Sequence, residues 1–133
     1  MPFVTLMLIY RNPDMTPEQF RDHYENVHIP LVKSLVGPAF PLVHTRHYIK
    51  RATAASDGDV TYPATVYTGS QDDFSFDCSS ELKFETEAAF YELSAVLARS
   101  DVALELEKDC GRFMDSEKTK TVVMGEINET LKA

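Results

Sequence analysis

The first segment of the chain, from Phe3 to Tyr10, is apolar at nearly every position. A strand with one face in water alternates apolar and polar residues, whereas this run has no face that suits solvent. We therefore expect a strand that is covered on both sides. Any fold for this chain must supply a cover for each face of the sheet that contains this strand.

The segments that follow give the order strand, helix, strand, strand, helix, strand. The first helix is predicted from Pro17 to Val36, because Thr16 and Gln19 form a capping-box pattern at its start and Gly37 follows its end. The other expected elements are strands at 42–51, 74–84 and 121–127, a helix after Thr86, and a short helix from Ser100 or Asp101 to Gly111. This order predicts a ferredoxin-like α+β sandwich.

A chain of 133 residues is most simply one domain, here 1–133, with a loop excursion at about 52–73 that carries a short strand candidate at 65–68. In such a sandwich the helices cover one face of the sheet. The first strand is apolar on both faces, so the second face also needs a cover. We expect a homodimer in which two sheets face each other and form a dimeric α+β barrel.

The composition argues against several partners. The formal net charge is −8 with no cluster of lysine or arginine, so a nucleic-acid partner is not expected. The apolar start is too short to cross a bilayer and lacks a basic flank, so no membrane partner is expected. Cys78 and Cys110 have neither a close-pair nor a metal-like spacing. These features predict a cytoplasmic protein.

The first helix carries the residues best suited to chemistry. Counting about 100° per residue places Phe20, Tyr24, Val27 and Leu31 on one stripe, with His28 at its edge. Pro30 cannot donate to the carbonyl of Asn26, so a kink or break is expected beside His28. Two interpretations remain open: His28 caps freed carbonyls and packs on the core, or it transfers protons near neutral pH.

The second strand carries further candidates, divided by its alternation. Val43, Thr45, His47 and Ile49 share one face, and His44, Arg46 and Tyr48 share the other. Only one face of a strand can look into a cavity between sheet and helices. We favour His47 for that position because its face is otherwise apolar.

Other chemistries find little support in the sequence. His44 and His47 point to opposite faces of a strand, and His23 and His28 are about 140° apart on an α-helix, so no metal site is predicted. The glycines are isolated, so no nucleotide cofactor is expected. Cys78 is interpreted as a packed thiol. The acidic residues Glu105, Glu107 and Asp109 are interpreted as solvated charge.

The frame Phe20, Tyr24, His28, Pro30, Leu31 resembles the first-helix signature of the EthD family of dimeric α+β-barrel proteins. The segments 81–84 and 112–126 are similar to the third-strand and last-strand segments of that family. The resemblance implies a small cofactor-free fold whose relatives include lactone isomerases, polyketide cyclases, decarboxylases of hydroxylated anthraquinone acids and an accessory protein of ether degradation. It also implies that His28 is the catalytic residue, with Tyr24 one turn before it.

The resulting hypothesis is a cofactor-independent lyase that decarboxylates a hydroxylated aromatic polyketide carboxylic acid of the anthraquinone type. His28 is the predicted acid and Tyr24 orients the small aromatic substrate, while His47 or Tyr48 holds a ring oxygen. The remaining predicted substrate-binding residues are His44, Tyr62, Tyr67 and Phe76. Alternatives are a polyketide cyclase, dehydratase or isomerase using His28 as a base, a non-catalytic accessory or stress-related binding protein, and a cofactor-free oxygenase.

Overall fold

The computed structural model describes residues 2–133, so Met1 of the predicted domain 1–133 lies outside the described residues. A four-stranded antiparallel sheet with the order β2-β5-β1-β6 forms one layer. Its strands are β1 (Phe3–Ile9), β2 (Val43–Tyr48), β5 (Cys78–Phe84) and β6 (Lys120–Met124). The first and third strands of the βαββαβ order lie in the centre, which is the ferredoxin-like α+β topology expected from the sequence.

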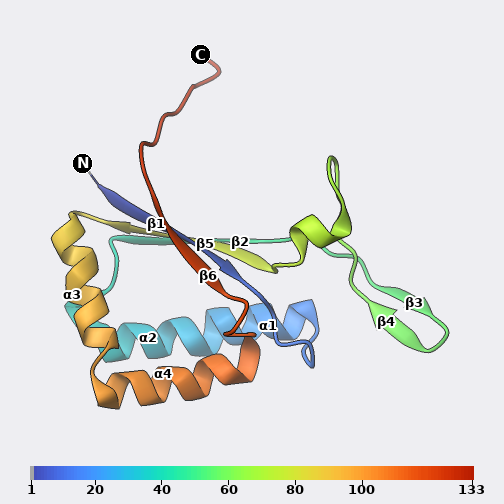
Figure 1. Cartoon of the computed structure of the whole chain (residues 1–133), viewed down its shortest axis with the longest axis horizontal. Coiled ribbons are helices and arrows are strands. Elements are labelled where there is room, and N and C mark those ends of the chain that lie inside the picture. Colours follow the sequence, from blue (N-terminus) through green and yellow to red (C-terminus); the bar gives the residue numbers. More distant parts are fainter. Residues whose placement is uncertain (1) are drawn as a thin grey trace.

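The helices form the second layer, on one side of the sheet (Figure 1). They are α1 (Pro17–His23), α2 (Ile29–Val36), α3 (Glu87–Leu97) and α4 (Ser100–Phe113). Both halves of the predicted capping box are present at Thr16 and Gln19, and Gly37 ends α2 with a positive φ of 54°. The expected end of the last helix at Gly111 is wrong, because α4 continues to Phe113, whose ring is fully buried in the core.

A π-helical turn, Tyr24–His28, joins α1 to α2 where a kink or break was expected. The amide of Ile29 donates to the carbonyl of Tyr24, five residues back, and Pro30 lies in the first turn of α2. The π-turn contains one residue more than an α-helical turn. The side chain that points to the core therefore comes one position later in the sequence than an α-helical count predicts. His28 is buried where Val27 was expected, and Val27 is 46% exposed.

Both faces of β1 are apolar, but the helices cover only one of them, although Val4 on the other face is itself 2% exposed. Ile9 and Met7 pack against Phe20, Tyr24 and Phe113 under the helices. The opposite face of the sheet has no helix over it in residues 2–133 (Figure 1). The strand registers place on that open face Val4, Leu6 and Leu8 of β1, Val122 and Met124 of β6, Ser79, Glu81 and Lys83 of β5, and Val43, Thr45 and His47 of β2.

The excursion after β2 forms a hairpin that projects from the end of the sheet (Figure 1). Its strands are β3 (Ala54–Ser56) and β4 (Asp59–Thr61), and the turn residues Asp57 and Gly58 have φ values of 50° and 83°. Two positive φ values at an Asp-Gly pair are typical of a type I′ turn. The strand expected at 65–68 is absent from the described residues, because the hairpin pairing lies earlier in the excursion.

The last residues leave the sheet on the side opposite the helices (Figure 1). Ile127 and Leu131 in this extended segment are 51% and 77% exposed. Among residues 2–133, none of the helices combines the length and the apolar character that a membrane crossing needs.

Candidate active site

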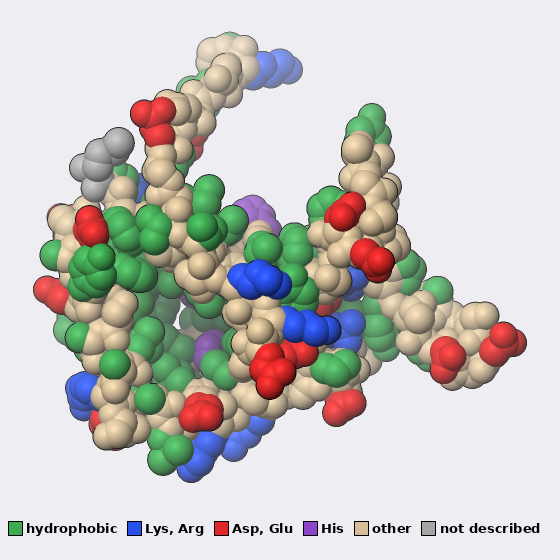
Figure 2. All heavy atoms as spheres, viewed as in Figure 1, with side chains coloured by type: hydrophobic (Ala, Val, Ile, Leu, Met, Phe, Trp, Pro, Cys, Tyr) green, Lys and Arg blue, Asp and Glu red, His purple; other side chains and the backbone are tan. Residues whose placement is uncertain are grey.

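An apolar pocket of about 150 Å³ lies between the sheet and the helices. In Figure 2 a histidine is visible at the bottom of a hollow that hydrophobic side chains surround. Tyr24, His28 and His44 bring nitrogen or oxygen atoms to the pocket, and Cys110 brings a thiol. The rest of the lining is Met7, Ile29, Val32, Phe40, Pro41, Leu82, Leu93, Leu97 and Leu106. An apolar pocket with a few polar groups is the usual form of a small-molecule site.

His28 reaches the pocket because the π-turn rotates it into the buried stripe. Its Nδ1 lies 2.9 Å from Oδ2 of Asp109, and its ring packs 4.7 Å from the Phe113 ring, centre to centre. Within residues 2–133, the one hydrogen-bond partner of the His28 ring is Asp109, at Nδ1, so Nε2 is left without a partner. Burial lowers the pKa of His28, although the hydrogen bond and the charge of Asp109 act in the opposite direction. A neutral ring with one uncommitted nitrogen therefore faces the pocket.

Asp109 is the functional residue that sequence reasoning missed. It is 1% exposed, and its second oxygen lies 2.9 Å from Nε2 of His23. Burial opposes ionisation, but the hydrogen bonds from His28 and His23 hold the pKa of Asp109 below its usual value. The interpretation of Asp109 as solvated charge is therefore wrong. One signal was available: Val102, Leu106, Asp109 and Phe113 have helical spacing, so the carboxylate occupies a position on the apolar stripe.

The predicted separation of His23 and His28 is also wrong. Residues five apart diverge by about 140° on an α-helix, but a π-turn has more residues per turn and brings them close to one side. Both rings therefore reach one carboxylate, and both pack on Phe113, at ring distances of 4.9 Å and 4.7 Å. Among residues 2–133, no group of three or more histidine, cysteine or acidic side chains is arranged to hold a metal ion.

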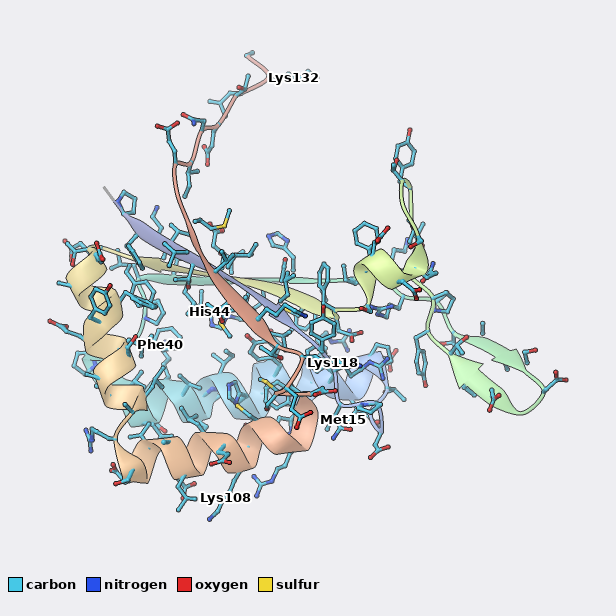
Figure 3. The ribbon with its side chains drawn as sticks, in the orientation of Figure 1. Met15, Phe40, His44, Lys108, Lys118 and Lys132 are labelled. Carbon is cyan, nitrogen blue, oxygen red and sulfur yellow. The ribbon has the colours of Figure 1, made fainter. Side chains whose placement is uncertain are left out.

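Tyr24 lies at the centre of a second polar group. Its hydroxyl is 2.8 Å from Oγ of Ser80 and 3.3 Å from Nε2 of His44. Burial raises the pKa of Tyr24, so the phenol stays protonated. Burial and the charge of Arg46 lower the pKa of His44 to about 4, so this ring is neutral at pH 7. In Figure 3 His44 and Phe40 occupy the space between the sheet and the helices.

Glu25 fixes the second strand to the π-turn. It accepts hydrogen bonds from Arg46 at 2.6 and 2.8 Å and another from the hydroxyl of Tyr48. These contacts turn the face that contains His44, Arg46 and Tyr48 toward the helices. The preference for His47 as the residue facing the cavity is therefore wrong, because His47 is exposed on the open face of the sheet.

The other predicted substrate-binding residues lie outside this pocket. The Tyr48 hydroxyl is engaged by Glu25, and Tyr67 is fully exposed in the excursion. Phe76 packs edge-on against Tyr10, and Tyr62 lies under the guanidinium of Arg11. The structure thus brings together Tyr24, His28 and His44 of the predicted set. Tyr48 packs edge-on against Tyr24, at a ring distance of 6.2 Å, but does not line the pocket. His47, Tyr62, Tyr67 and Phe76 lie elsewhere.

A larger depression of about 310 Å³, lined by both apolar and charged residues, lies at the other end of the sheet. Its lining includes Glu18, Lys50, Arg51 and Asp77. Arg51 is paired with Asp77 at 2.7 Å, so the buried charges here already satisfy each other. The apolar pocket beside His28 is therefore the stronger candidate.

The fold and the pocket together define a ferredoxin-like α+β protein with a histidine and a tyrosine in an apolar cavity. The EthD domain model matches residues 12–117, which include the π-turn, the strands β2 and β5 that contribute His44 and Leu82 to the pocket, and Asp109. The chain belongs to the EthD domain family. No curated protein sequence matches it significantly.

Solved structures agree on the fold. An EthD family protein from Bacillus halodurans C-125 is 19% identical with a TM-score of 0.53, over 94% of this chain and 99% of that one. A hypothetical protein from Arabidopsis thaliana is 15% identical with a TM-score of 0.52, over 98% and 92%. A dimeric ferredoxin-like protein of unknown function from Thermobifida fusca YX is 12% identical with a TM-score of 0.50, over 95% and 92%. At these identities the likeness concerns the fold alone.

Proposed function

We propose that this protein is a cofactor-independent lyase that decarboxylates a hydroxylated aromatic polyketide carboxylic acid. One observation carries the proposal: Nε2 of His28 faces an apolar pocket without a partner in residues 2–133, while Nδ1 is held by a buried carboxylate. A positioned imidazole of this kind gives and takes protons, an effect worth about 10² to 10⁴ in rate.

The proposed step consumes one proton and releases carbon dioxide. The substrate carboxylate, once beside His28, favours the imidazolium because a nearby negative charge raises the pKa of the ring. Nε2–H then protonates the ring carbon that bears the carboxylate. The bond to the carboxylate breaks, its electron pair returns to the ring, carbon dioxide leaves, and His28 is neutral again.

The size of the pocket suggests how such a substrate is held. A cavity of about 150 Å³ with an apolar lining accommodates a single benzene-sized ring. We infer that the ring bearing the carboxylate enters the pocket, while the other rings of an anthraquinone-type acid extend through its mouth. Tyr24 and His44 lie where they can bind a phenolic oxygen of that ring.

Mass spectrometry tests the reaction directly. The purified protein is incubated, without added metal or cofactor, with hydroxylated benzoic, naphthoic and anthraquinone carboxylic acids. We expect a product lighter by one carbon dioxide, and at least a 100-fold slower reaction for His28→Ala. His47→Ala is the matched control, since His47 lies on the open face. Unchanged turnover in a folded His28→Ala protein contradicts the mechanism, and ligand binding without product favours a binding protein.

A second candidate reaction is proton abstraction beside a carbonyl, as in a polyketide cyclase, dehydratase or isomerase. The lowered pKa of His28 favours it, because the neutral ring presents a lone pair to the pocket. The pH dependence of kcat/KM separates the two. For the acid, the rate falls about tenfold per pH unit above the His28 pKa, whereas for the base it rises up to that pKa and then stays level.

We also propose that the protein is a homodimer that pairs the open faces of two sheets. The exposed apolar residues Val43, Val122 and Met124 on that face support this, as does the dimeric relative from Thermobifida fusca YX. Analytical ultracentrifugation measures the association. Val122→Glu is expected to weaken the dimer, and the exposed helix substitution Leu104→Glu, on the other layer, serves as the control.

A further inference from the structure

Asp109 receives two imidazole nitrogens on its two oxygens. Oδ2 lies 2.9 Å from Nδ1 of His28, and Oδ1 lies 2.9 Å from Nε2 of His23. An ionised carboxylate only accepts hydrogen bonds, so each facing nitrogen must carry the hydrogen. A neutral imidazole has one N–H, and in His28 it is therefore on Nδ1. The pocket-facing Nε2 is left as the basic atom.

We propose that Asp109 is a positioning residue that fixes the tautomer and orientation of the His28 ring, while His23 holds the carboxylate in place. The catalytic consequence rests on the proposed function, but the tautomer assignment does not. This arrangement has the logic of a catalytic triad, in which a buried carboxylate orients a histidine whose other nitrogen meets the substrate.

The surroundings of Asp109 fit a positioning role better than a simple ion pair. Arg112 is the remaining cationic contact of Asp109 within residues 2–133, at 3.5 Å, and its side chain is 66% exposed. The two strong partners are histidines, and an imidazole can donate a hydrogen bond to a carboxylate without carrying a charge. A leucine at this position would continue the stripe of Val102, Leu106 and Phe113 without any cost of burying charge.

The local fold also restricts both rings. Phe113, which is fully buried, stacks on His23 with an interplanar angle of 20° and packs tilted at 48° against His28. Tyr24 contacts His28 from another side, edge-on at a ring distance of 5.7 Å. His28 therefore has two aromatic contacts and one carboxylate that limit its rotation. The π-turn is what makes this shared carboxylate possible, since it brings His23 and His28 to one side.

Nitrogen NMR of the ¹⁵N-histidine-labelled protein at neutral pH tests the assignment. We expect His28 to show a protonated Nδ1 and an unprotonated Nε2, and His23 to show the opposite tautomer. Asp109→Leu removes the acceptor and preserves the apolar stripe, so His28 is expected to lose the pure Nδ1–H form. The matched control is Arg112→Gln, which removes the exposed cationic contact of Asp109, and His28 should keep its tautomer there.

Two results overturn the inference: an Nε2–H tautomer of His28 in the wild-type protein, or a pure Nδ1–H form that persists in Asp109→Leu. The wild-type spectrum decides the first even if a variant fails to fold. With a turned-over substrate, we expect kcat/KM of Asp109→Leu to fall about 10²- to 10⁴-fold, mainly in kcat, with Arg112→Gln within about tenfold of wild type. If the tautomers are as expected and no substrate reacts, the positioning role stands and the proposed lyase activity fails.

Discussion

Two buried carboxylates in this protein face similar electrostatic problems with different partners. Asp77, 6% exposed, lies just before β5 and is bound by Nε of Arg11 at 3.3 Å and Nε of Arg51 at 2.7 Å. Asp109, 1% exposed, lies in α4 and is bound by His23 and His28 at 2.9 Å each. Each carboxylate thus has two close basic side chains against it, and Asp109 has the exposed Arg112 as a third contact at 3.5 Å.

The difference lies in whether the partners can lose a proton. A guanidinium does not give up its proton in proteins, so the arginine partners of Asp77 keep their charge. An imidazole changes charge near neutral pH, so the Asp109 group can take more than one ionisation state. Two similar clusters of buried charge therefore serve different ends. Asp77 fixes chain segments, and Asp109 orients the His28 ring, which can transfer a proton.

The positions of the two clusters agree with this division. Asp77 and Arg51 tie the end of β2 to the excursion, because Arg51 also donates to the carbonyls of Tyr62, Phe74 and Phe76. That end of the sheet lies away from the apolar pocket. Asp109 stands directly behind the one pocket residue that has an uncommitted ring nitrogen, His28.

The largest expected effect on stability is that of Asp77→Ala. Removing this carboxylate leaves two guanidinium groups without their counter-ion, and breaking a buried pair in this way costs about 3–5 kcal/mol. Urea denaturation measures the loss in free energy of unfolding. Asp72→Ala, at an exposed position in the same segment, is the control and should change stability by less than about 0.5 kcal/mol.

Asp109→Leu is the matching variant in the other cluster. Its partners become neutral imidazoles instead of unpaired cations, and the new side chain continues an apolar stripe, so we expect a loss below about 1.5 kcal/mol. Equal losses in free energy of unfolding for Asp77→Ala and Asp109→Leu would contradict the proposed difference between arginine partners and histidine partners.

The next effect is on the pH dependence of stability. The pKa of His44 is lowered to about 4 in the folded protein, mainly by burial, whereas the ordinary pKa of an unfolded histidine is about 6.5. The unfolded chain therefore binds the proton first as the pH falls. The contribution of His44 to the free energy of unfolding is therefore fully present above pH 6.5. It is lost as the pH falls from 6.5 to 4, by up to about 3 kcal/mol.

Denaturation of His44→Phe across that pH range measures the contribution. The lowered pKa of His28 acts in the same direction, so the variant should retain a smaller slope rather than none. His47→Gln, on the exposed face of the same strand, should follow the wild type. An undiminished slope in His44→Phe would mean that His44 is not held neutral by its surroundings.

Much of the fold could be predicted because its signals are local. The capping box at Thr16, the cap at Thr86 and the positive φ of Gly37 depend on neighbouring residues alone. The alternation from Cys78 to Phe84 predicted which residues of β5 are buried, because successive side chains of a strand point to opposite faces of the sheet. The hairpin at Asp57 and Gly58 also had a local signal, the Asp-Gly pair, which the prediction did not use.

The site was harder to predict because each missing piece depends on tertiary contacts. Alternation divided β2 correctly into two faces, but only the bonds of Glu25 to Arg46 and Tyr48 decide which face meets the helices. An α-helical count placed His23 and His28 apart, because the count contains no information on a π-turn. Asp109 looked solvated by its residue type, although its position on the stripe of α4 indicates burial.

A further expected effect, that of Arg51→Lys, separates charge from geometry in the Asp77 cluster. Lysine keeps the positive charge beside Asp77 but presents one nitrogen, whereas Arg51 makes four bonds of 2.7–2.9 Å that point in different directions. We expect a loss of about 1–2 kcal/mol and faster hydrogen exchange in residues 52–76. Arg99→Lys, in an exposed pair with Asp101, is the matched control and should hardly change the free energy of unfolding.

If charge alone holds the segment, Arg51→Lys will match the wild type, and the Asp77 cluster would then be an ordinary ion pair. The expected loss instead shows why arginine serves this cluster: it satisfies three backbone carbonyls and one carboxylate without ever giving up a proton, which is the opposite of what His28 requires beside Asp109.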